Sequence, residues 1–412
     1  MSRTRRSLLA AVSLTLAASM TSACGGILGG GGDDSASGKT LEFWMYQPTL
    51  PQQSEAIQKL KEGFEKENNV KVKIVEVPKD DYNTKLASAL SSGGGPDAGY
   101  LDQPLVASYA LDGSVQKVPA GTIDETAYFA GALETNRVGG DLYGVPIAHT
   151  TVALFYNKKF VKTPPKTWDE LLATSEAVHK AHPDVAGVNV PKGDGYGAWI
   201  IPAFVGSAGG TMADTEAKKV TFDDQPAVEA VTLWTDLLKS SPRKITDTAD
   251  SFGHERAAMT FTGPWDVAAF KDKFPDLDFG VAPLPVKNTP AGNIGGENSV
   301  VFKGAKDSEL AWKWLEYLTD TEHNGALANA LSGFPANQKA ADKAALSADP
   351  SYRVFVEQLA VAQARPAVPE WIQINDDFVA VALDEAFRGK ATPQAALTEG
   401  ADKARALLKW SK

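Results

Sequence analysis

Residues 139–159 read Gly-Gly-Asp-Leu-Tyr-Gly-Val-Pro-Ile-Ala-His-Thr-Thr-Val-Ala-Leu-Phe-Tyr-Asn-Lys-Lys, and this stretch decides the fold. A Gly-Gly turn is followed by a short segment that contains Pro146. Residues 150–156 are β-branched and aromatic, with no polar side chain between Thr151 and Tyr156, so they are predicted to form a strand buried on both faces. A strand that is entered through Gly and Pro can leave one sheet and enter another. We therefore expect the chain to cross between two sheets here.

A second stretch, residues 295–302, mirrors the first one. It reads Gly-Gly-Glu-Asn-Ser-Val-Val-Phe, which is two glycines, polar residues and then a short apolar run. We interpret it as the return of the chain to the first sheet. A chain of 412 residues is also too long for one ordinary hydrophobic core, so two domains are expected.

The order of elements before the first crossing predicts a parallel sheet. The expected elements are strands at 39–46 and 70–77, helices at 52–68 and 80–90, and a third strand after the loop 91–97. This alternation of strands and helices is typical of a doubly wound α/β sheet. Such sheets bind ligands beyond the carboxyl ends of their strands, which here are residues 44–47 and 100–103.

The composition narrows the possible functions. The formal net charge is −10, and residues 1–23 carry three arginines and no acid, so the rest of the chain carries −10 − 3 = −13. So acidic a body is not expected to hold nucleic acid or anionic lipid by general attraction. The single cysteine excludes an internal disulfide framework, and five scattered histidines argue against a zinc centre. We therefore expect no metal and no cofactor.

The N-terminus is expected to be a targeting signal. Three arginines precede an apolar run, Leu8 to Ala18, and small residues precede Cys24. The apolar run is too short to span a bilayer comfortably. The arrangement resembles a bacterial lipoprotein signal, which implies that residues 1–23 are removed and that Cys24 is lipidated. Residues 24–38 are mostly Gly, Ser and Asp and are predicted to be a flexible tether.

Six short phrases occur in one order along the chain. They are Gly-Pro-Asp (95–97), Tyr-Gly-Val-Pro (143–146), Lys-Thr-Trp-Asp-Glu-Leu (166–171), Ala-Ala-Met with Gly-Pro-Trp (257–259 and 263–265), Gly-Gly (295–296) and Trp-Lys-Trp-Leu-Glu-Tyr-Leu-Thr (312–319). This series resembles the sugar-binding, maltose-binding-protein-like class of extracellular solute-binding proteins. The resemblance implies two α/β lobes, each a doubly wound, mostly parallel sheet flanked by helices, with a ligand cleft between them. Lobe 1 is expected to comprise residues 39–149 with 299–343, and lobe 2 residues 150–298 with 344–412.

Aromatic residues are the first candidates for ligand contact, because a sugar ring presents an apolar C–H face to an aromatic plate. Trp44 and Tyr46 end the first predicted strand, Trp199 is placed in a Gly-rich apolar loop, Trp265 follows Gly-Pro, and Trp371 is placed in an irregular segment. The resemblance implies that Trp265 and Trp371 stack on sugar. The alternative for each of these residues is core packing, which we expect for Trp168, Trp312 and Trp314.

Polar residues are the second group of candidates, because carboxylates, amides and arginine bind the hydroxyl rim of a sugar. Gln47, Asp102 and Gln103 lie at strand ends, His149 and Thr150 in the first crossing, and Glu297 and Asn298 in the second, while Arg365 is a further candidate. Glu297 could instead brace a hinge, and Arg365 could be solvated.

The function implied by the resemblance is that of a monomeric, lipid-anchored receptor on the outer face of the bacterial cytoplasmic membrane. It would capture a mono- or oligosaccharide and deliver it to an ABC permease, without being an enzyme. A first alternative is a receptor for a polyol, glycerophosphodiester or peptide, although the candidate loops are poor in the basic groups that phosphate calls for. A second is a secreted glycoside hydrolase, which needs two carboxylates about 5–10 Å apart. Asp102 and Glu297 would be the pair to consider.

Overall fold

A computed structural model describes residues 39–48, 51–331, 333–343 and 349–410. The predicted signal peptide (1–23), the lipidation site Cys24 and the predicted tether (24–38) lie outside these residues. Within the described ranges, none of the helices has the length and apolar character needed to cross a membrane.

The first sheet has six strands in the order β15-β6-β14-β3-β1-β2. They are β1 (Thr40–Tyr46), β2 (Lys71–Val77), β3 (Ala98–Asp102), β6 (Val145–Thr150), β14 (Gly295–Val301) and β15 (Phe334–Pro335). β1 pairs in parallel with β2 and β3, which confirms the parallel sheet predicted for the first three strands. β14 then runs antiparallel to both β3 and β6, so the return of the chain to this sheet is also confirmed.

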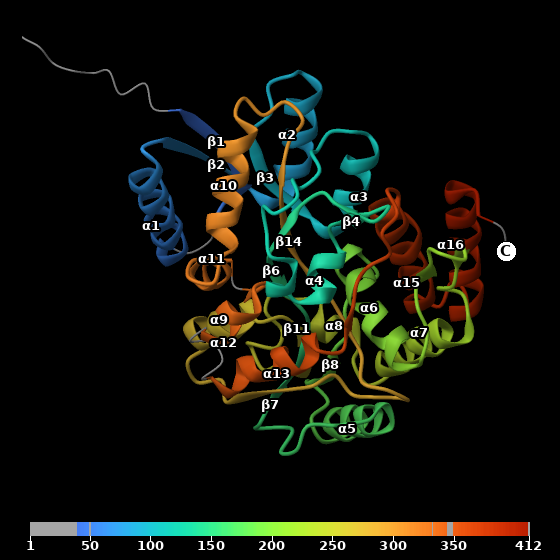
Figure 1. Cartoon of the computed structure of the whole chain (residues 1–412). Helices are drawn as coiled ribbons and strands as arrows, with labels where there is room; N and C mark the ends of the chain where they lie inside the picture. The colour runs from blue at the N-terminus through green and yellow to red at the C-terminus, as the bar shows by residue number, and fades with distance from the viewer. Residues whose placement is uncertain (1–38, 49–50, 332, 344–348, 411–412) are drawn as a thin grey trace, which may run out of the picture. The chain divides into compact units, whose positions relative to one another are not determined.

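Helices cover this sheet with apolar side chains. They are α1 (Pro51–Asn68), α2 (Lys79–Ser91), α3 (Gln103–Leu111), α4 (Ala130–Glu134), α10 (Ser308–Thr319), α11 (Asn324–Ala330) and α12 (Gln338–Lys343). In Figure 1, α10 (orange) lies beside β1 and β2 (blue), although they come from opposite halves of the chain. The ring of Trp314 on α10 lies 5.8 Å from Phe43 and 5.0 Å from Phe64, centroid to centroid. We call this sheet with its helices lobe 1.

The second sheet has four strands in the order β12-β7-β11-β8. They are β7 (Ala153–Asn157), β8 (Ala186–Asn189), β11 (Ala257–Thr262) and β12 (Phe279–Ala282). The surrounding helices are α5 (Trp168–Ala181), α6 (Gly195–Ser207), α7 (Gln225–Leu237), α8 (Arg243–Thr246), α9 (Trp265–Lys273), α13 (Pro350–Leu359), α14 (Trp371–Gln373), a π-helix (Ile374–Val379), α15 (Ala380–Phe387) and α16 (Pro393–Leu408). We call this sheet with its helices lobe 2. Its largest apolar core is separate from that of lobe 1.

Short elements complete the part of the chain that the structure describes. They are a 3₁₀ turn (Glu125–Ala127) and the strand pairs β4 (Arg137–Val138) with β5 (Asp141–Leu142), β9 (Ala213–Asp214) with β10 (Lys219–Val220), and β13 (Gly292–Asn293) with β16 (Ala362–Gln363).

The first crossing differs in detail from the strand predicted at residues 150–156. The structure divides it at Thr151 and Val152, both fully buried, so that β6 stays in lobe 1 and β7 belongs to lobe 2. β6 pairs with β14 and β15, whereas β7 pairs with β11 and β12. The partners in two different sheets, which lie far away in the sequence, decide where the strand breaks.

Two further expectations about lobe 2 are wrong. Trp199 lies within helix α6 rather than in a loop, because the Asp194 side chain caps the helix by accepting a hydrogen bond from the Gly197 amide at 3.0 Å. The sequence also predicts a helix at 252–259 and a loop from Gly263 to Asp266, but the structure has a turn at 249–255 followed by β11 from Ala257, and α9 begins at Trp265. Residues 255–259 (Glu-Arg-Ala-Ala-Met) have high helix propensity, so the pairing of β11 with β7 and β8 overrides the local preference there.

Candidate ligand-binding cleft

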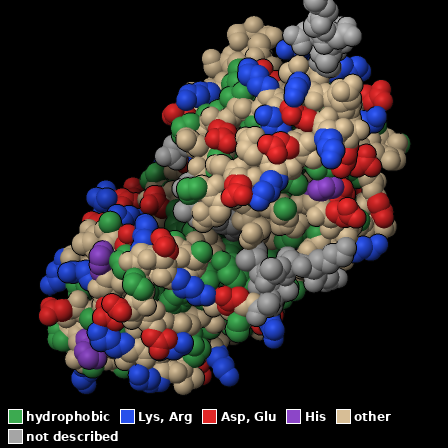
Figure 2. Space-filling view, turned by 90° about the vertical axis from the view of Figure 1, so that its left-hand side faces the viewer, with side chains coloured by type: hydrophobic (Ala, Val, Ile, Leu, Met, Phe, Trp, Pro, Cys, Tyr) green, Lys and Arg blue, Asp and Glu red, His purple; other side chains and the backbone are tan. Residues whose placement is uncertain are grey.

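A cavity of about 620 Å³ lies between the carboxyl end of β3, the start of β14 and the N-termini of α6, α9 and α14. We call it the main cleft. In Figure 2, hydrophobic side chains gather in a hollow on the face shown, while Lys and Arg alternate with Asp and Glu around it. No group of three or more His, Cys, Asp or Glu side chains suited to a metal ion occurs in the described part of the chain.

Lobe 2 contributes an aromatic wall to the main cleft. The wall consists of Tyr196 and Trp199 on α6, Trp265 on α9 and Trp371 on α14. Ring centroids are 5.7 Å apart for Tyr196 and Trp199 and 6.2 Å apart for Trp199 and Trp265. The four rings differ in exposure, since Tyr196 is 41% exposed whereas Trp371 is 2% exposed. The tilted, partly exposed rings of Tyr196, Trp199 and Trp265 can each contact the apolar face of a sugar, whereas Trp371 is packed in the apolar core of lobe 2.

The Gly-Pro-Trp phrase has a steric explanation at this wall. The indole of Trp265 folds back over Gly263, where a Cβ atom would lie 2.2 Å from its six-membered ring. Only glycine leaves the space in which this indole can lie.

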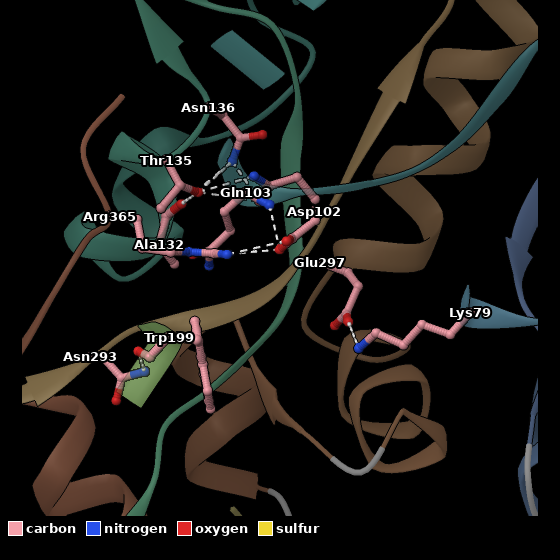
Figure 3. A network of polar contacts seen from close by, with 11 residues as sticks. Lys79, Asp102, Gln103, Ala132, Thr135, Asn136, Trp199, Asn293, Glu297 and Arg365 are labelled. Atoms are coloured by element: carbon pink, nitrogen blue, oxygen red, sulfur yellow. Dashed lines mark hydrogen bonds and ion pairs between the residues drawn. The ribbon is translucent and has the colours of Figure 1, made fainter. Parts of the chain in front are cut away.

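The opposite side of the main cleft carries an ion pair. Arg365 donates two hydrogen bonds to the Asp102 carboxylate, from Nη2 to Oδ1 at 2.6 Å and from Nη1 to Oδ2 at 3.1 Å (Figure 3). Asp102 ends β3 and also accepts a hydrogen bond from the Gln103 amide at the start of α3. Burial by itself would raise the pKa of Asp102, but the Arg365 guanidinium, with Lys79 and the Gln103 amide, holds this pKa below its ordinary value.

Glu297 is a second carboxylate in the same wall. It is the cross-strand partner of Asp102 in the β14–β3 ladder. Its Oε1 lies 3.8 Å from the Lys79 ammonium, and a dashed line marks this ion pair in Figure 3. Burial raises the pKa of Glu297, because Lys79 offsets only part of the cost of removing the charge from water and Asp102 adds repulsion. The neighbouring Thr150 hydroxyl is buried and has no hydrogen-bond partner in the described structure. Both groups are available to sugar hydroxyls.

The structure brings some of the candidate residues together and not others. The main cleft is lined by Asp102, Thr150, Trp199, Trp265, Glu297, Arg365 and Trp371. The remaining candidates do not line it, and these are Trp44, Tyr46, Gln47, Gln103, His149 and Asn298. Ligand contact by any of these residues stays a prediction.

The candidates outside the main cleft have other surroundings. Trp44 donates its indole N–H to Glu42 at 2.8 Å, and Tyr46 packs edge-on against Tyr82 at 4.7 Å. Gln47 is exposed, and its backbone N–H donates to Val77.

The buried amides among them lie behind the cleft wall. Asn298 is fully buried and accepts a hydrogen bond from Asn136 Nδ2 at 2.8 Å. Gln103 is 4% exposed and lines a separate cavity of about 300 Å³, into which Arg365 also extends.

His149 is buried in β6 and has a stability consequence. It is 4% exposed, its Nδ1 has no partner among the described residues, and it packs edge-on against Phe129 at 5.1 Å. Burial lowers its pKa to about 4. The His149 imidazole is therefore protonated near pH 6.5 in the unfolded chain, whereas in the folded chain it stays neutral down to about pH 4. Above pH 6.5 His149 does not reduce the free energy of unfolding. As the pH falls towards 4, the free energy of unfolding decreases, by about 2 kcal/mol at pH 5.

We expect His149→Leu to remove this part of the acid sensitivity. Urea unfolding at pH 7.5 and pH 5 measures it, and the loss of stability between the two should be about 2 kcal/mol smaller in the variant. The exposed His254 provides the control, since His254→Leu should leave the loss unchanged. An equal loss in His149→Leu and the wild type would contradict the assignment.

Sequence reasoning missed several residues of the main cleft. They are Lys79, Asn83, Tyr196, Asn375 and Asp376. Lys79 could have been found, because it follows β2 and so lies at the carboxyl edge of the sheet, where ligands bind. Asn375 and Asp376 lie on the π-helix after Trp371, and nothing in the local sequence marks them.

Comparison with known proteins identifies the family to which the chain is similar and a solved structure with a similar fold. Residues 59–354 match the family model described as bacterial extracellular solute-binding protein. The maltodextrin-binding protein MdxE of Bacillus subtilis (strain 168) is 27% identical over 360 residues, which covers 83% of this chain and 85% of that protein. The galactooligosaccharide-binding protein of the same organism is 26% identical over 431 residues, which covers 98% and 96%. The GacH receptor of Streptomyces glaucescens GLA.O, solved unliganded and with acarbose, has a TM-score of 0.79 at 25% identity and covers 91% of this chain and 100% of its own.

Proposed function

Because the chain belongs to the family of bacterial extracellular solute-binding proteins, we propose that it is a receptor that captures a carbohydrate and delivers it to an ABC permease. The observation that carries the proposal is the composition of the main cleft. Three indoles and a phenol from lobe 2 face Asp102, Glu297 and Arg365 across one cavity. Relatives named for maltodextrin and galactooligosaccharide binding support a sugar as the solute.

This combination of groups suits both surfaces of a sugar. The ring's C–H face packs on an indole, while its hydroxyls donate to carboxylates and accept from arginine. Covering about 150 Å² of an indole at about 25 cal/mol/Å² contributes at most about 3–4 kcal/mol. Two such contacts and a few hydrogen bonds are enough for micromolar binding, which corresponds to about −8 kcal/mol.

Capture takes place by closure of two lobes. We propose that residues 39–149 with 299–343 form lobe 1 and residues 150–298 with 344–412 form lobe 2, except that Thr150 and residues 295–298 pair within the first sheet and therefore belong to lobe 1. The hinges are the two crossings, at residues 148–151 and 295–299, since hinge closure concentrates backbone change in a few connecting residues. Gly296 has a φ of +132°, which favours glycine, and lies against the backbone of Ala148. The hinge strands therefore pack closely where the chain crosses.

In this proposal the protein is anchored to the membrane by a lipid. The family name places it outside the cell. The lipoprotein-like signal of residues 1–23, which precedes Cys24, supports a lipid anchor on the outer face of the cytoplasmic membrane, with residues 24–38 as the tether of a monomer. The tether lets the receptor reach its permease while it stays attached to the membrane.

A hydrolytic function is the weaker alternative. Asp102 and Glu297 are cross-strand neighbours, but Asp102 is held by two hydrogen bonds from Arg365 and one from the Gln103 amide. A carboxylate engaged in this way is poorly placed to act as nucleophile or base in sugar cleavage. Incubation with oligosaccharides should give no shorter products, and chromatography checks this.

A thermal-shift screen tests the proposed function. A solute that binds only the folded state at about 100 times its Kd adds about 2.7 kcal/mol of stability. We expect at least one mono- or oligosaccharide to raise the melting temperature by roughly 3 °C, because the unfolding entropy of a chain of this length is roughly 0.8 kcal/mol/K. Polyols, glycerophosphodiesters and peptides form the comparison set. A rise with one of these and with no sugar would assign the receptor to a different solute.

A further inference from the structure

Trp199 of the aromatic wall is attached to the second crossing at two points. Its indole packs on Gly295, the first residue of β14, where a Cβ atom would lie 2.6 Å from the ring atom Cζ2. Its backbone carbonyl accepts a hydrogen bond from Asn293 Nδ2 at 2.8 Å (Figure 3). One residue of the cleft wall is therefore held, through its ring and through its backbone, by the segment 293–295.

The turn of α6 that carries Trp199 has hydrogen-bond partners outside the helix. Pro202 lies three residues further along the helix, lacks a backbone N–H and crowds the carbonyl four residues before it, so it interrupts the hydrogen-bond ladder. Asn375 donates from Nδ2 to the carbonyl of the first residue of α6 at 3.2 Å, and Asn293 donates to that of Trp199. The first turn of α6 is thus held by two asparagines from other segments.

The side chain of Asn293 uses only part of its hydrogen-bonding capacity. It is 1% exposed, and its Nδ2 donates to Trp199, whereas its Oδ1 has no hydrogen-bond partner in the described structure. A buried carbonyl without a partner destabilises the folded state. An apolar side chain of similar size would avoid this cost, so the stability of the fold does not by itself account for an amide at this position.

Asn293 also lies directly before the proposed hinge. Two residues later the chain enters β14, whose Gly295 and Gly296 pair with β6 of lobe 1. The segment 293–296 is therefore joined to lobe 1 through β6 and to the aromatic wall of lobe 2 through Trp199. A displacement of Trp199 consequently displaces the segment in which hinge closure would concentrate the backbone change.

We propose that Asn293 is a positioning residue for carbohydrate binding. It holds Trp199 against Gly295, so that a sugar on the Trp199 indole engages the residues at which the lobes close. Asn293 itself does not contact the sugar, since it lies outside the lining of the main cleft. The proposal rests on the proposed carbohydrate-receptor function and adds to it the residue that connects the aromatic wall with the second crossing.

The experiment compares Asn293→Leu with the wild type by calorimetric titration and stopped-flow fluorescence. The probe is the saccharide that raises the melting temperature most in the thermal-shift screen, with maltotriose and galactobiose in the set. Asn293→Leu removes the donor and keeps a similar volume, so affinity should fall at least fivefold. The loss should appear mainly as faster dissociation, because Trp199 acts in the complex after the sugar has entered the cleft.

Two further variants show whether the hydrogen bond is the cause. Asn293→Gln keeps an amide donor, and the adjoining cavity of about 300 Å³ has room for its extra methylene group, so this variant should recover most of the lost affinity. The matched control is Asn288→Leu, because Asn288 lies outside the main cleft and donates from Nδ2 to the Ala208 carbonyl at the other end of α6, at 2.9 Å. This control should bind the probe as the wild type does.

A double-mutant cycle tests whether Asn293 acts through Trp199. In a Trp199→Ala background, which has lost the ring that Asn293 positions, Asn293→Leu should cost less than twofold in affinity. An equal loss in both backgrounds would show that Asn293 does not act through Trp199 and would overturn the proposal.

The remaining outcomes separate this proposal from the receptor function. If saccharides bind the wild type but Asn293→Leu binds them as Asn288→Leu does, the positioning role is overturned while the receptor function stands. A lower melting temperature of Asn293→Leu at unchanged affinity would likewise assign the residue to the fold alone. If no saccharide in the screen binds the wild type, the receptor function fails and the positioning role fails with it.

Discussion

Replacing Trp265 by alanine is expected to weaken carbohydrate binding at least tenfold while the fold is kept. Trp265 lines the main cleft beside Trp199, with the two ring centroids 6.2 Å apart, so its loss removes part of the aromatic wall. Its apolar contact contributes up to about 3–4 kcal/mol by area, and tenfold corresponds to about 1.4 kcal/mol. The loss of affinity therefore exceeds tenfold even if the bound sugar gains only about half of this contribution.

Calorimetry on the Trp265→Ala variant measures this loss, and a melting curve shows that the protein is folded. The matched control is Trp410→Ala, because Trp410 is also a half-buried tryptophan of lobe 2 but lies outside the main cleft. We expect the control to bind within twofold of the wild type. Unchanged affinity in Trp265→Ala would remove Trp265 from the binding site.

The second large effect is expected at the ion pair between Arg365 and Asp102. Arg365→Met keeps the length of the side chain but leaves the Asp102 carboxylate without its guanidinium. Breaking a fully buried pair costs about 3–5 kcal/mol, and the Asp102 side chain is 34% exposed, so about 3 kcal/mol is expected at pH 7. Carbohydrate affinity should fall at least tenfold as well, because both groups face the main cleft.

The effect of Arg365→Met on stability should depend on pH in a defined direction. The pKa of Asp102 is lower in the folded than in the unfolded chain. Its stabilising contribution is therefore present above the unfolded pKa of about 4 and is lost as the pH falls through the lower folded pKa. The difference between wild type and variant should shrink between pH 7 and pH 3.

Urea unfolding at several pH values measures this difference. The double variant Arg365→Met with Asp102→Asn serves as control. It removes both charges, so it should recover part of the stability that is lost in Arg365→Met. A loss that is independent of pH, or a double variant less stable than Arg365→Met, would show that the ion pair is not the cause.

The local sequence determined the architecture of this protein and part of its site. Glycines before apolar runs marked both crossings, with Pro146 as a further mark of the first, and the alternation of strand and helix over residues 39–103 predicted the parallel part of lobe 1. The rule that ligands bind at strand ends led to Asp102, and the crossings led to Thr150 and Glu297. These signals are local, because they depend on backbone preferences and on the spacing of apolar residues within one segment.

Only the tertiary structure decided which neighbouring side chains enter the main cleft. Glu297 lines it and Asn298 is buried behind it, because successive side chains of a strand point to opposite faces. Tyr196 and Trp199 reach it together because Asp194 caps a helix that the composition did not indicate. Arg365 is joined to Asp102 by a fold that brings residues 263 positions apart into contact. Register, helix rotation and long-range pairing depend on partners remote in the sequence, which no single segment specifies.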